Sequence, residues 1–359
     1  MASLRKRGRV WYYRYVDADG VKRSRKGCTD RRATEELARA ADAEAAKIRA
    51  GLVDVKDLAR RDHQARPLSE HVTAWRDAML NQGHTPKHSD QSADRVRRLI
   101  AVMFGARPDE IDGKTMSRPR QEQARATIDR LVAKAKVSDI ATERVQAALA
   151  IFRDSGRSAQ TCNHYRACVR AFARWAWKTG RLRDNPLVGL TDYNAKEDRR
   201  HDRRTISLDE LTRLIEVADR GAAFQAMTGP ARALCYRLAA STGLRYSEIA
   251  SITPASFDWE GPSVRVAAAY TKNRQEAELP LPNDLADDLR PYVATLATDS
   301  PVFPLPAKGA EMLRADLEAA GIPYRDASGL FFDFHSLRCQ TATLADAAGI
   351  SPRVVQRLM

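Results

Sequence analysis

Four cationic side chains in the second half of the sequence are of types that stabilise concentrated negative charge. Arg245 stands in STGLRYSEI, at a predicted corner between two helices. His335 and Arg338 are three residues apart at the start of a predicted apolar helix, so they share a face. Lys272 falls at the tip of a predicted hairpin. Because a guanidinium presents planar donors that match two phosphate oxygens, these residues could hold a phosphate group. A structural ion pair with Glu248 is the alternative for Arg245.

Helices and one small hairpin must position these side chains. Residues 231–242 are predicted to form an apolar helix that a glycine ends, and 264–269 and 277–281 two strands joined by a turn. The sequence Ser207-Leu-Asp-Glu210 is a capping box, which predicts that a new helix and a new domain begin there. The candidate residues therefore belong to one domain at the end of the chain.

The N-terminal segment carries more than half of the excess positive charge. Residues 1–32 hold 11 Lys or Arg against three Asp, a net charge of +8 out of +14 for the chain. Alternating aromatic residues, an Asp19-Gly20 turn and an Ala/Glu-rich stretch at 33–50 predict a small basic sheet backed by a helix. Such a unit could bind DNA, and the alternative is a solvated basic hairpin. The candidate DNA contacts are Arg14, Lys22, Arg23 and Arg25.

A helical block is predicted from Pro67 onward, and its helix at 158–179 is the most informative. An apolar stripe runs along one face of this helix. Arg166, Arg170 and Arg174 recur every four residues on an adjacent face, which could lie against phosphates. A solvated arginine face on an ordinary bundle helix is the alternative.

Composition excludes several classes of protein. The 359 residues are 43% apolar and 30% charged, as in a globular protein of two or three domains. No apolar run approaches the roughly 18 residues of a membrane helix, so we expect no membrane-spanning segment. Five scattered cysteines without a CxxC pair predict a reducing cytoplasm and no structural zinc. The polar, highly charged stretch 191–206 is predicted to be an interdomain linker.

Three motifs in order, TGLRYSE, YTKN followed by LPLP, and HSLR, resemble the tyrosine recombinase (phage-type integrase) family. The helix within SAQTCNHYRACVRAFARWAWKTGRLRDNPL is similar to the end of that family's core-binding domain, and the basic hairpin more loosely to its arm-binding domain. The resemblance implies a mainly α fold with small β elements (α+β). Its expected domains are an arm-type DNA-binding domain at 1–60, a helical, SAM-like core-binding domain at 67–190, the linker at 191–206, and a mixed α/β-hairpin catalytic domain at 207–359.

The resemblance also implies roles for the candidate residues. Arg245 and Arg338 match the two phosphate-clamping arginines, and Lys272 the hairpin lysine that protonates the departing 5′ oxygen. His335 matches the histidine that accepts or positions the proton of the nucleophile. Glu248 occupies the acidic position that braces the first arginine. The implied chemistry, cleavage and rejoining of DNA strands through a 3′-phosphotyrosyl link, needs no metal and no nucleotide cofactor.

Two positions depart from the family pattern. Cys339 stands where a second histidine is usual, and none of the ten tyrosines follows HSLR, so no residue matches the nucleophile. We therefore expect a recombinase subunit that is incomplete at its C-terminus, through truncation or gene decay, and inactive in cleavage. The alternatives are a non-catalytic DNA-binding regulator of recombination sites and a DNA-relaxing topoisomerase. The resemblance implies double-stranded DNA as partner, a homotetramer on DNA and a cytoplasmic, nucleoid-associated location in a bacterial or phage setting.

Overall fold

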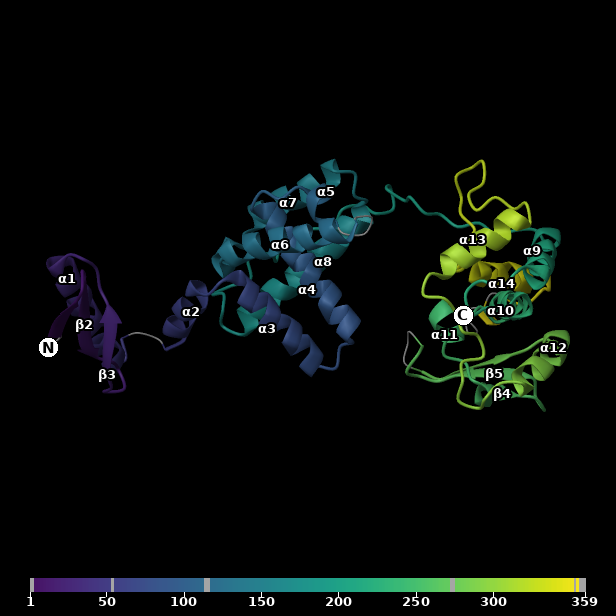
Figure 1. Ribbon diagram of the computed structural model, residues 1–359, viewed down its shortest axis with the longest axis horizontal. Helices are drawn as coiled ribbons and strands as arrows, with labels where there is room; N and C mark the ends of the chain where they lie inside the picture. Colours follow the sequence, from purple (N-terminus) through teal and green to yellow (C-terminus); the bar gives the residue numbers. More distant parts are fainter. Residues whose placement is uncertain (1–2, 53–54, 113–116, 272–274, 352, 355–359) are drawn as a thin grey trace. The chain divides into compact units, whose positions relative to one another are not determined.

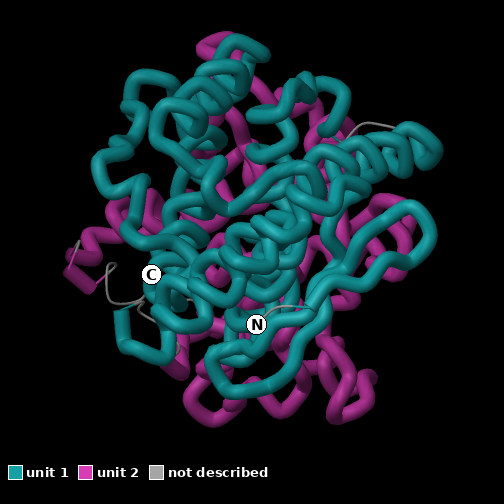
Figure 2. Tube along the Cα trace, turned by 90° about the vertical axis from the view of Figure 1, so that its left-hand side faces the viewer, with its two compact units in different colours: residues 1–199 teal, residues 200–359 magenta. Residues whose placement is uncertain are grey.

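The chain folds into two compact units, residues 1–199 and residues 200–359 (Figure 2). The computed structural model describes the whole chain apart from residues 1–2, 53–54, 113–116, 272–274, 352 and 355–359. Each unit has its own hydrophobic core. Helices predominate, with two small antiparallel sheets, so the predicted mainly α fold with small β elements is confirmed.

The first unit begins with a three-stranded antiparallel sheet in the order β1-β2-β3. Its elements are β1 (Ser3–Arg7), β2 (Val10–Val16), β3 (Lys22–Lys26) and the helix α1 (Arg31–Arg49). Helix α1 packs on the face of the sheet that buries Tyr13. The guanidinium of Arg31 on α1 also stacks over the ring of Trp11, 5.6 Å from its centroid. Since side chains alternate along a strand, Arg14 lies on the opposite, open face.

The sheet has one more strand than the sequence predicts. Strand β1 consists of Ser-Leu-Arg-Lys-Arg and has no apolar alternation. It becomes a strand because its backbone pairs with β2, in a register that sets Leu4 opposite Tyr13. A strand that forms through pairing with a neighbour need not show an alternating apolar pattern in its own sequence, so β1 could not be predicted locally.

The rest of the first unit is helical (Figure 1). Its elements are α2 (Val55–Ala65), α3 (Leu68–Asn81), α4 (Pro86–Met103), α5 (Pro108–Ile111), α6 (Arg118–Lys134), a 3₁₀ turn (Val137–Asp139), α7 (Thr142–Asp154) and α8 (Ala159–Lys178). Helices α3, α4, α6, α7 and α8 share one core. In it the rings of Trp75 and Phe172 meet edge to face at 5.5 Å.

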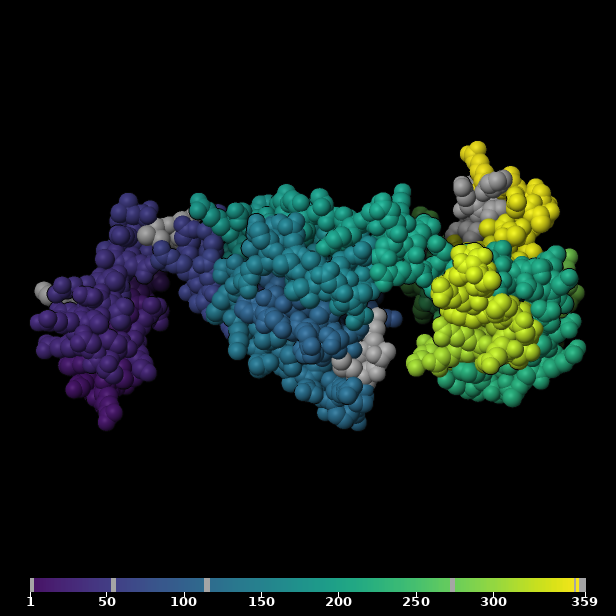
Figure 3. Space-filling view, turned by 90° about the horizontal axis from the view of Figure 1, so that it is seen from above, coloured from purple at the N-terminus to yellow at the C-terminus, as the bar shows by residue number. Residues whose placement is uncertain are grey.

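The second unit combines helices with a second three-stranded sheet, in the order β4-β5-β6. Its elements are α9 (Leu208–Arg220), α10 (Gly229–Thr242), α11 (Tyr246–Ile249), a 3₁₀ turn (Pro254–Ser256), β4 (Phe257–Asp258), β5 (Ser263–Val266), β6 (Ala277–Pro280), α12 (Asn283–Ala294), α13 (Gly309–Ala319) and α14 (Ser336–Ala347). Helix α10 is almost wholly buried and packs against both α9 and α14 (Figure 1). Helix α13 and the loop after it form the yellow-green part of the surface of this unit in Figure 3.

The polar stretch 191–206 is attached to protein on both sides of the boundary between the units. In the first unit, Asn163 and the backbone of Tyr193 exchange two hydrogen bonds of 2.9 Å. Asp198 accepts a hydrogen bond from the amide of Ala159 at 2.6 Å and pairs with Arg153. Residues 200–206 belong to the second unit. Several of the charges in this stretch, among them Asp192, Asp198 and Arg203, thus form specific ion pairs.

Two further properties concern the described residues only. None of their helices is both long enough and apolar enough to cross a membrane. They also include no cluster of three or more His, Cys, Asp or Glu side chains that could hold a metal ion.

Candidate active site

Arg245 occupies the corner between α10 and α11. Helix α10 ends at Gly243, whose φ of +68° is a left-handed conformation that glycine adopts without strain. Arg245 then caps α11, where the buried carboxylate of Glu248 accepts from its backbone amide at 2.8 Å and from Nη1 at 2.7 Å. The expected ion pair with Glu248 is therefore present. Because 34% of the Arg245 side chain stays exposed, the pair also fixes this cation at the surface of the corner.

Arg338 reaches the same corner from the first turn of α14. Its side chain is buried, and its Nη1 donates to the carbonyl oxygen of Gly243. One turn further along α14, Thr341 donates to the carbonyl of Ala239 at 3.3 Å. The glycine that ends α10 therefore supplies both the turn that presents Arg245 and the acceptor that orients Arg338.

His335 is exposed at the N-terminal end of α14, three residues before Arg338. Although the residue is exposed, partial desolvation lowers the pKa of His335, and the cations Arg203, Arg338 and Arg245 lower this pKa further, while Asp333 opposes them. Burial likewise lowers the pKa of Arg338, with Arg245 adding to the effect. These mutual effects mean that the histidine and the arginines lie within electrostatic reach of one another.

The structure thus groups Arg245, Glu248, His335 and Arg338 at one corner of the second unit. Lys272 lies outside the described residues. Strands β5 and β6, which precede and follow it in the sequence, pair antiparallel with Val266 opposite Ala277. Sequence reasoning missed Arg203 and Asp333, which also act on His335. The sequence gives a signal for Asp333 alone: an acidic residue three positions before Ser336, where α14 begins, is typical of a helix cap.

Three of the five tyrosines of the second unit use their hydroxyl groups within the fold. Tyr236 is buried and donates to Asp316 at 2.6 Å. Tyr246, although next to Arg245, donates to a backbone carbonyl, and burial raises its pKa to about 12. Tyr292 donates to a backbone carbonyl at 3.0 Å. These three hydroxyls are therefore unsuited to attack a phosphate.

The predicted contacts of the N-terminal sheet divide between its two faces. Arg14 and Lys22 lie on the open face, whereas Arg23 and Arg25 pair opposite Tyr15 and Tyr13 and so share the face that α1 covers. All four are exposed, but Arg23 is held by Asp17 at 2.7 Å. Three basic residues that the sequence analysis did not single out share the open face with Arg14 and Lys22; they are Arg5, Arg7 and Lys26.

The three arginines of α8 do not share one exposed face, which corrects the expectation for Arg166. That residue is buried, donates to the carbonyl of Leu190 at 2.7 Å and pairs with Asp192, so it holds the end of the bundle instead of facing solvent. Arg170 is partly exposed and Arg174 is exposed. The helical period could not reveal this difference, because four-residue spacing drifts around the helix by about 40° per step.

Arg174 lines a cavity of about 580 Å³ formed by α3, α4 and α8. Its walls include Trp75, Met79 and Trp175, with Lys178 as a second cation. The cavity therefore combines aromatic surface with positive charge on the face of α8 that carries Arg174.

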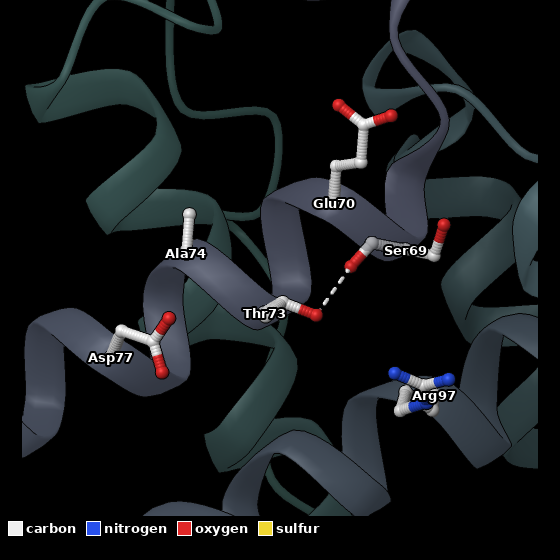
Figure 4. A pocket seen from close by; sticks show the side chains of 6 residues that line it. All are labelled: Ser69, Glu70, Thr73, Ala74, Asp77 and Arg97. Carbon is white, nitrogen blue, oxygen red and sulfur yellow. Dashed lines mark hydrogen bonds between the residues drawn. The ribbon is translucent and has the colours of Figure 1, made fainter.

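A second hollow of the first unit, shown in Figure 4, has a different character. Glu70 and Asp77 on α3 line it, and Arg97 of α4 lies across from them. The guanidinium of Arg97 pairs with Asp129 at 2.5 Å, so its charge is neutralised within the bundle. Two carboxylates and a paired arginine do not favour a phosphate backbone, so we exclude this hollow from the candidate nucleic-acid surface.

Comparison with solved structures shows which known proteins share this fold. The chain is similar in fold to a lambda integrase dimer bound to a COC′ core site, with a TM-score of 0.59, 19% identity, and coverage of 99% of this chain and 90% of the other. A lambda integrase tetramer bound to a Holliday junction gives a TM-score of 0.59 at 19% identity, covering 99% and 94%. The Tn1549 transposon integrase in complex with a circular intermediate DNA gives 0.55 at 12% identity, covering 82% and 91%.

The fold is therefore that of the tyrosine recombinases. Residues 204–359, which contain Arg245, Glu248, Lys272, His335 and Arg338, match the model of the phage integrase family. No curated protein sequence matches the chain.

Proposed function

We propose that this chain is a subunit of a site-specific DNA recombinase, in which Arg245 and Arg338 hold one backbone phosphate of duplex DNA. The observation that supports this most directly is that two arginines from different elements meet at one corner, each oriented by a fixed acceptor of the protein, Glu248 and the carbonyl of Gly243. Phosphoryl transfer places added negative charge on the non-bridging oxygens. Donors that are already oriented stabilise that charge without reorganising.

His335 and Lys272 are proposed for the proton transfers. A lowered pKa leaves the His335 imidazole neutral at pH 7, in the form that can accept or position a proton from the nucleophile. Lys272 is proposed, from its motif alone, to protonate the departing 5′ oxygen. No metal or nucleotide takes part in this scheme.

The DNA-binding surface is proposed to extend over the first unit. The open face of the N-terminal sheet, with Arg14 and Lys22, and the exposed part of α8, with Arg170 and Arg174, offer unburied cations. Arg23 and Arg25 are exposed at the other face of the sheet. The integrases of similar fold were solved on DNA as a dimer and a tetramer. We propose that this chain likewise assembles as a homotetramer on DNA, in the cytoplasm.

Affinity for duplex DNA as a function of salt tests the electrostatic part of this proposal. If six to ten phosphates are neutralised, the affinity falls by roughly 10³ to 10⁵ between 50 and 200 mM salt. Fluorescence anisotropy with a labelled duplex measures it. An affinity that does not change over this range would contradict the proposal.

Variants at the corner test the proposed phosphate site. Because Arg245 and Arg338 are proposed to share one phosphate, the double variant Arg245→Ala with Arg338→Ala should lower the slope of log affinity against log salt by about 0.9, the contribution of that phosphate. Arg237→Ala is the matched control, because that arginine is already paired with Asp284 and Asp288 and should leave the slope unchanged. If the double variant and the Arg237→Ala control gave the same slope as the parent chain, the corner would not hold a phosphate.

A non-catalytic DNA-binding regulator is a second candidate, favoured by the engagement of the Tyr236, Tyr246 and Tyr292 hydroxyls within the fold. Denaturing electrophoresis after incubation with labelled duplex DNA tests this second candidate. This 359-residue chain should give no covalent protein–DNA adduct. An adduct would assign the nucleophile to one of the ten tyrosines and exclude the regulator.

A further inference from the structure

Residues 200–206 lie across the loop that precedes α14, and we call this segment the strap. Its backbone forms a parallel bridge with Phe331, in which the amide of Arg204 donates to the Phe331 carbonyl at 2.9 Å and the amide of Phe331 donates to the Asp202 carbonyl at 2.8 Å. The ring of His201 stacks on the ring of Phe331 at 4.2 Å. The strap therefore has a defined register on the loop.

The strap forms hydrogen bonds with the chain both before His335 and after Arg338. At the near end, Arg203 Nε donates to both carboxylate oxygens of Asp333, at 2.8 and 3.0 Å, and His201 Nε2 lies 2.9 Å from the same carboxylate. At the far end, the buried side-chain amide of Gln340 exchanges two hydrogen bonds of 3.0 Å with the backbone of Ile206.

Asp333 transmits the near contact to the helix. Its carboxylate accepts from the amide of Ser336 at 3.0 Å, and the Ser336 hydroxyl accepts from the Asp333 amide at 3.1 Å, a reciprocal cap of α14. His335 stands between these two residues, and Arg338 begins the turn that Gln340 ends. The strap thus fixes the helical turn that carries both candidate residues.

The strap also contributes charge to the site. The charged groups that act on His335 are Arg203 from the strap, Asp333 from the loop, Arg338 from α14 and Arg245 from the corner of α11. The cations lower the pKa of His335 and Asp333 raises it. Arg203 and Asp333 are paired, yet they act on His335 with opposite signs.

We propose that Arg203 and Asp333 are positioning residues of the active site: through them the strap sets the orientation of the His335–Arg338 turn and the protonation of His335. This inference rests on the proposed function for its meaning in catalysis. The structural part of the inference does not require DNA: the pair fixes the start of α14, and its two charges shift the pKa of His335 in opposite directions.

Proton titration of His335 by NMR in the full chain tests the inference. Arg203→Gln keeps much of the side-chain length, removes the cation, and should raise the titration midpoint of His335. Asp333→Asn removes the anion and should lower it. In both variants the amides of residues 336–340 should exchange with solvent faster, by about fivefold, the factor that corresponds to ~1 kcal/mol for a weakened helix cap.

Two further variants serve as controls. Arg213→Ala removes an exposed cation from α9 and should change neither readout. Arg203→Lys keeps the charge without the planar fork, so it should keep the midpoint near that of the parent chain while the amides still exchange faster. A midpoint that is unchanged in Arg203→Gln, or that moves in the same direction in Arg203→Gln and Asp333→Asn, would overturn the proposal. Failure to bind DNA would leave this result unaffected and would count only against the proposed function.

Discussion

At the scale of single residues, the corner depends on positions where no other side chain fits. Gly309, the first residue of α13, lies against the ring of Tyr246, and an added Cβ would approach that ring to 2.2 Å. Tyr246 directly follows Arg245 and packs edge to face on Phe334 at 4.7 Å, next to His335. Atoms this close must move, and core residues move only at a cost.

Gly309→Ala is therefore expected to destabilise the second unit by about 1–3 kcal/mol. Gly261→Ala is the matched control, since a Cβ there meets nothing within 4 Å, and it should change stability by less than about 0.5 kcal/mol. Urea denaturation followed by circular dichroism measures both. Equal stability of the two variants would show that Tyr246 is free to shift.

Asp333 should make stability depend on pH. Burial acts to raise its pKa, but the hydrogen bonds from Arg203 and His201 prevail and lower it to about 2. A carboxylate with a lowered pKa stabilises the fold above its unfolded pKa, near 3.9, and loses this contribution as the pH falls through its folded pKa. The pair should thus contribute about 2 kcal/mol at pH 7.

Asp333→Asn should accordingly lower the free energy of unfolding by about 2 kcal/mol at pH 7 and at pH 5, and by less as the pH drops from 4 towards 2. Urea titrations of parent and variant at these pH values give the difference. A difference that persists undiminished at the lowest pH would mean that the carboxylate charge is not its source.

Spacing within each motif was enough to place Arg245, His335 and Arg338 at helix boundaries, and the resemblance of the motifs to one family predicted that these side chains share a site. The partners that orient them were mostly beyond the sequence. Arg203 is 130 positions from Asp333, and the acceptor of Arg338 is a backbone carbonyl that has no side-chain signature. Contacts of this kind exist only once the chain has folded.

At the scale of elements, α8 shows why a periodic pattern must be combined with burial. Arg166 and Arg174 have the same chemistry and helical spacing, but the first is buried against Leu190 and the second is exposed beside the cavity of α3, α4 and α8. One therefore belongs to the fold and the other is available to a partner. Strand β1 makes the complementary point, since it forms by pairing and not by pattern.

Alanine at these two positions should separate stability from binding. Arg166→Ala leaves the Leu190 carbonyl without its donor and should destabilise the first unit by about 1–3 kcal/mol, with the salt slope of DNA binding unchanged. Arg174→Ala should leave stability within about 0.5 kcal/mol and lower the salt slope by about 0.9. Thermal melts measure the stability of both variants, and anisotropy titrations measure their salt slopes. A lower salt slope in Arg166→Ala with unchanged stability would mean that Arg166 contacts DNA.

At the scale of the whole molecule, the two units have separate cores and should unfold as separate cooperative transitions. Leu149 is buried in the first core and Leu214 in the second. Truncation to alanine at either position should cost about 2–5 kcal/mol, and each variant should move a different transition in calorimetry. If both variants moved one shared transition, the two units would be a single cooperative unit.

The attachment of residues 191–206 on both sides limits how far the units can separate. Asp198 is bound to the first unit through Ala159 and Arg153, and His201 to the second through Asp333. Three peptide units join these two anchors, so their Cα atoms are never more than ~11 Å apart, whatever the orientation of the units. When one unit binds DNA, the other is held near the same duplex at an effective concentration in the millimolar range. Two weak contacts, one from each unit, then give a much higher overall affinity.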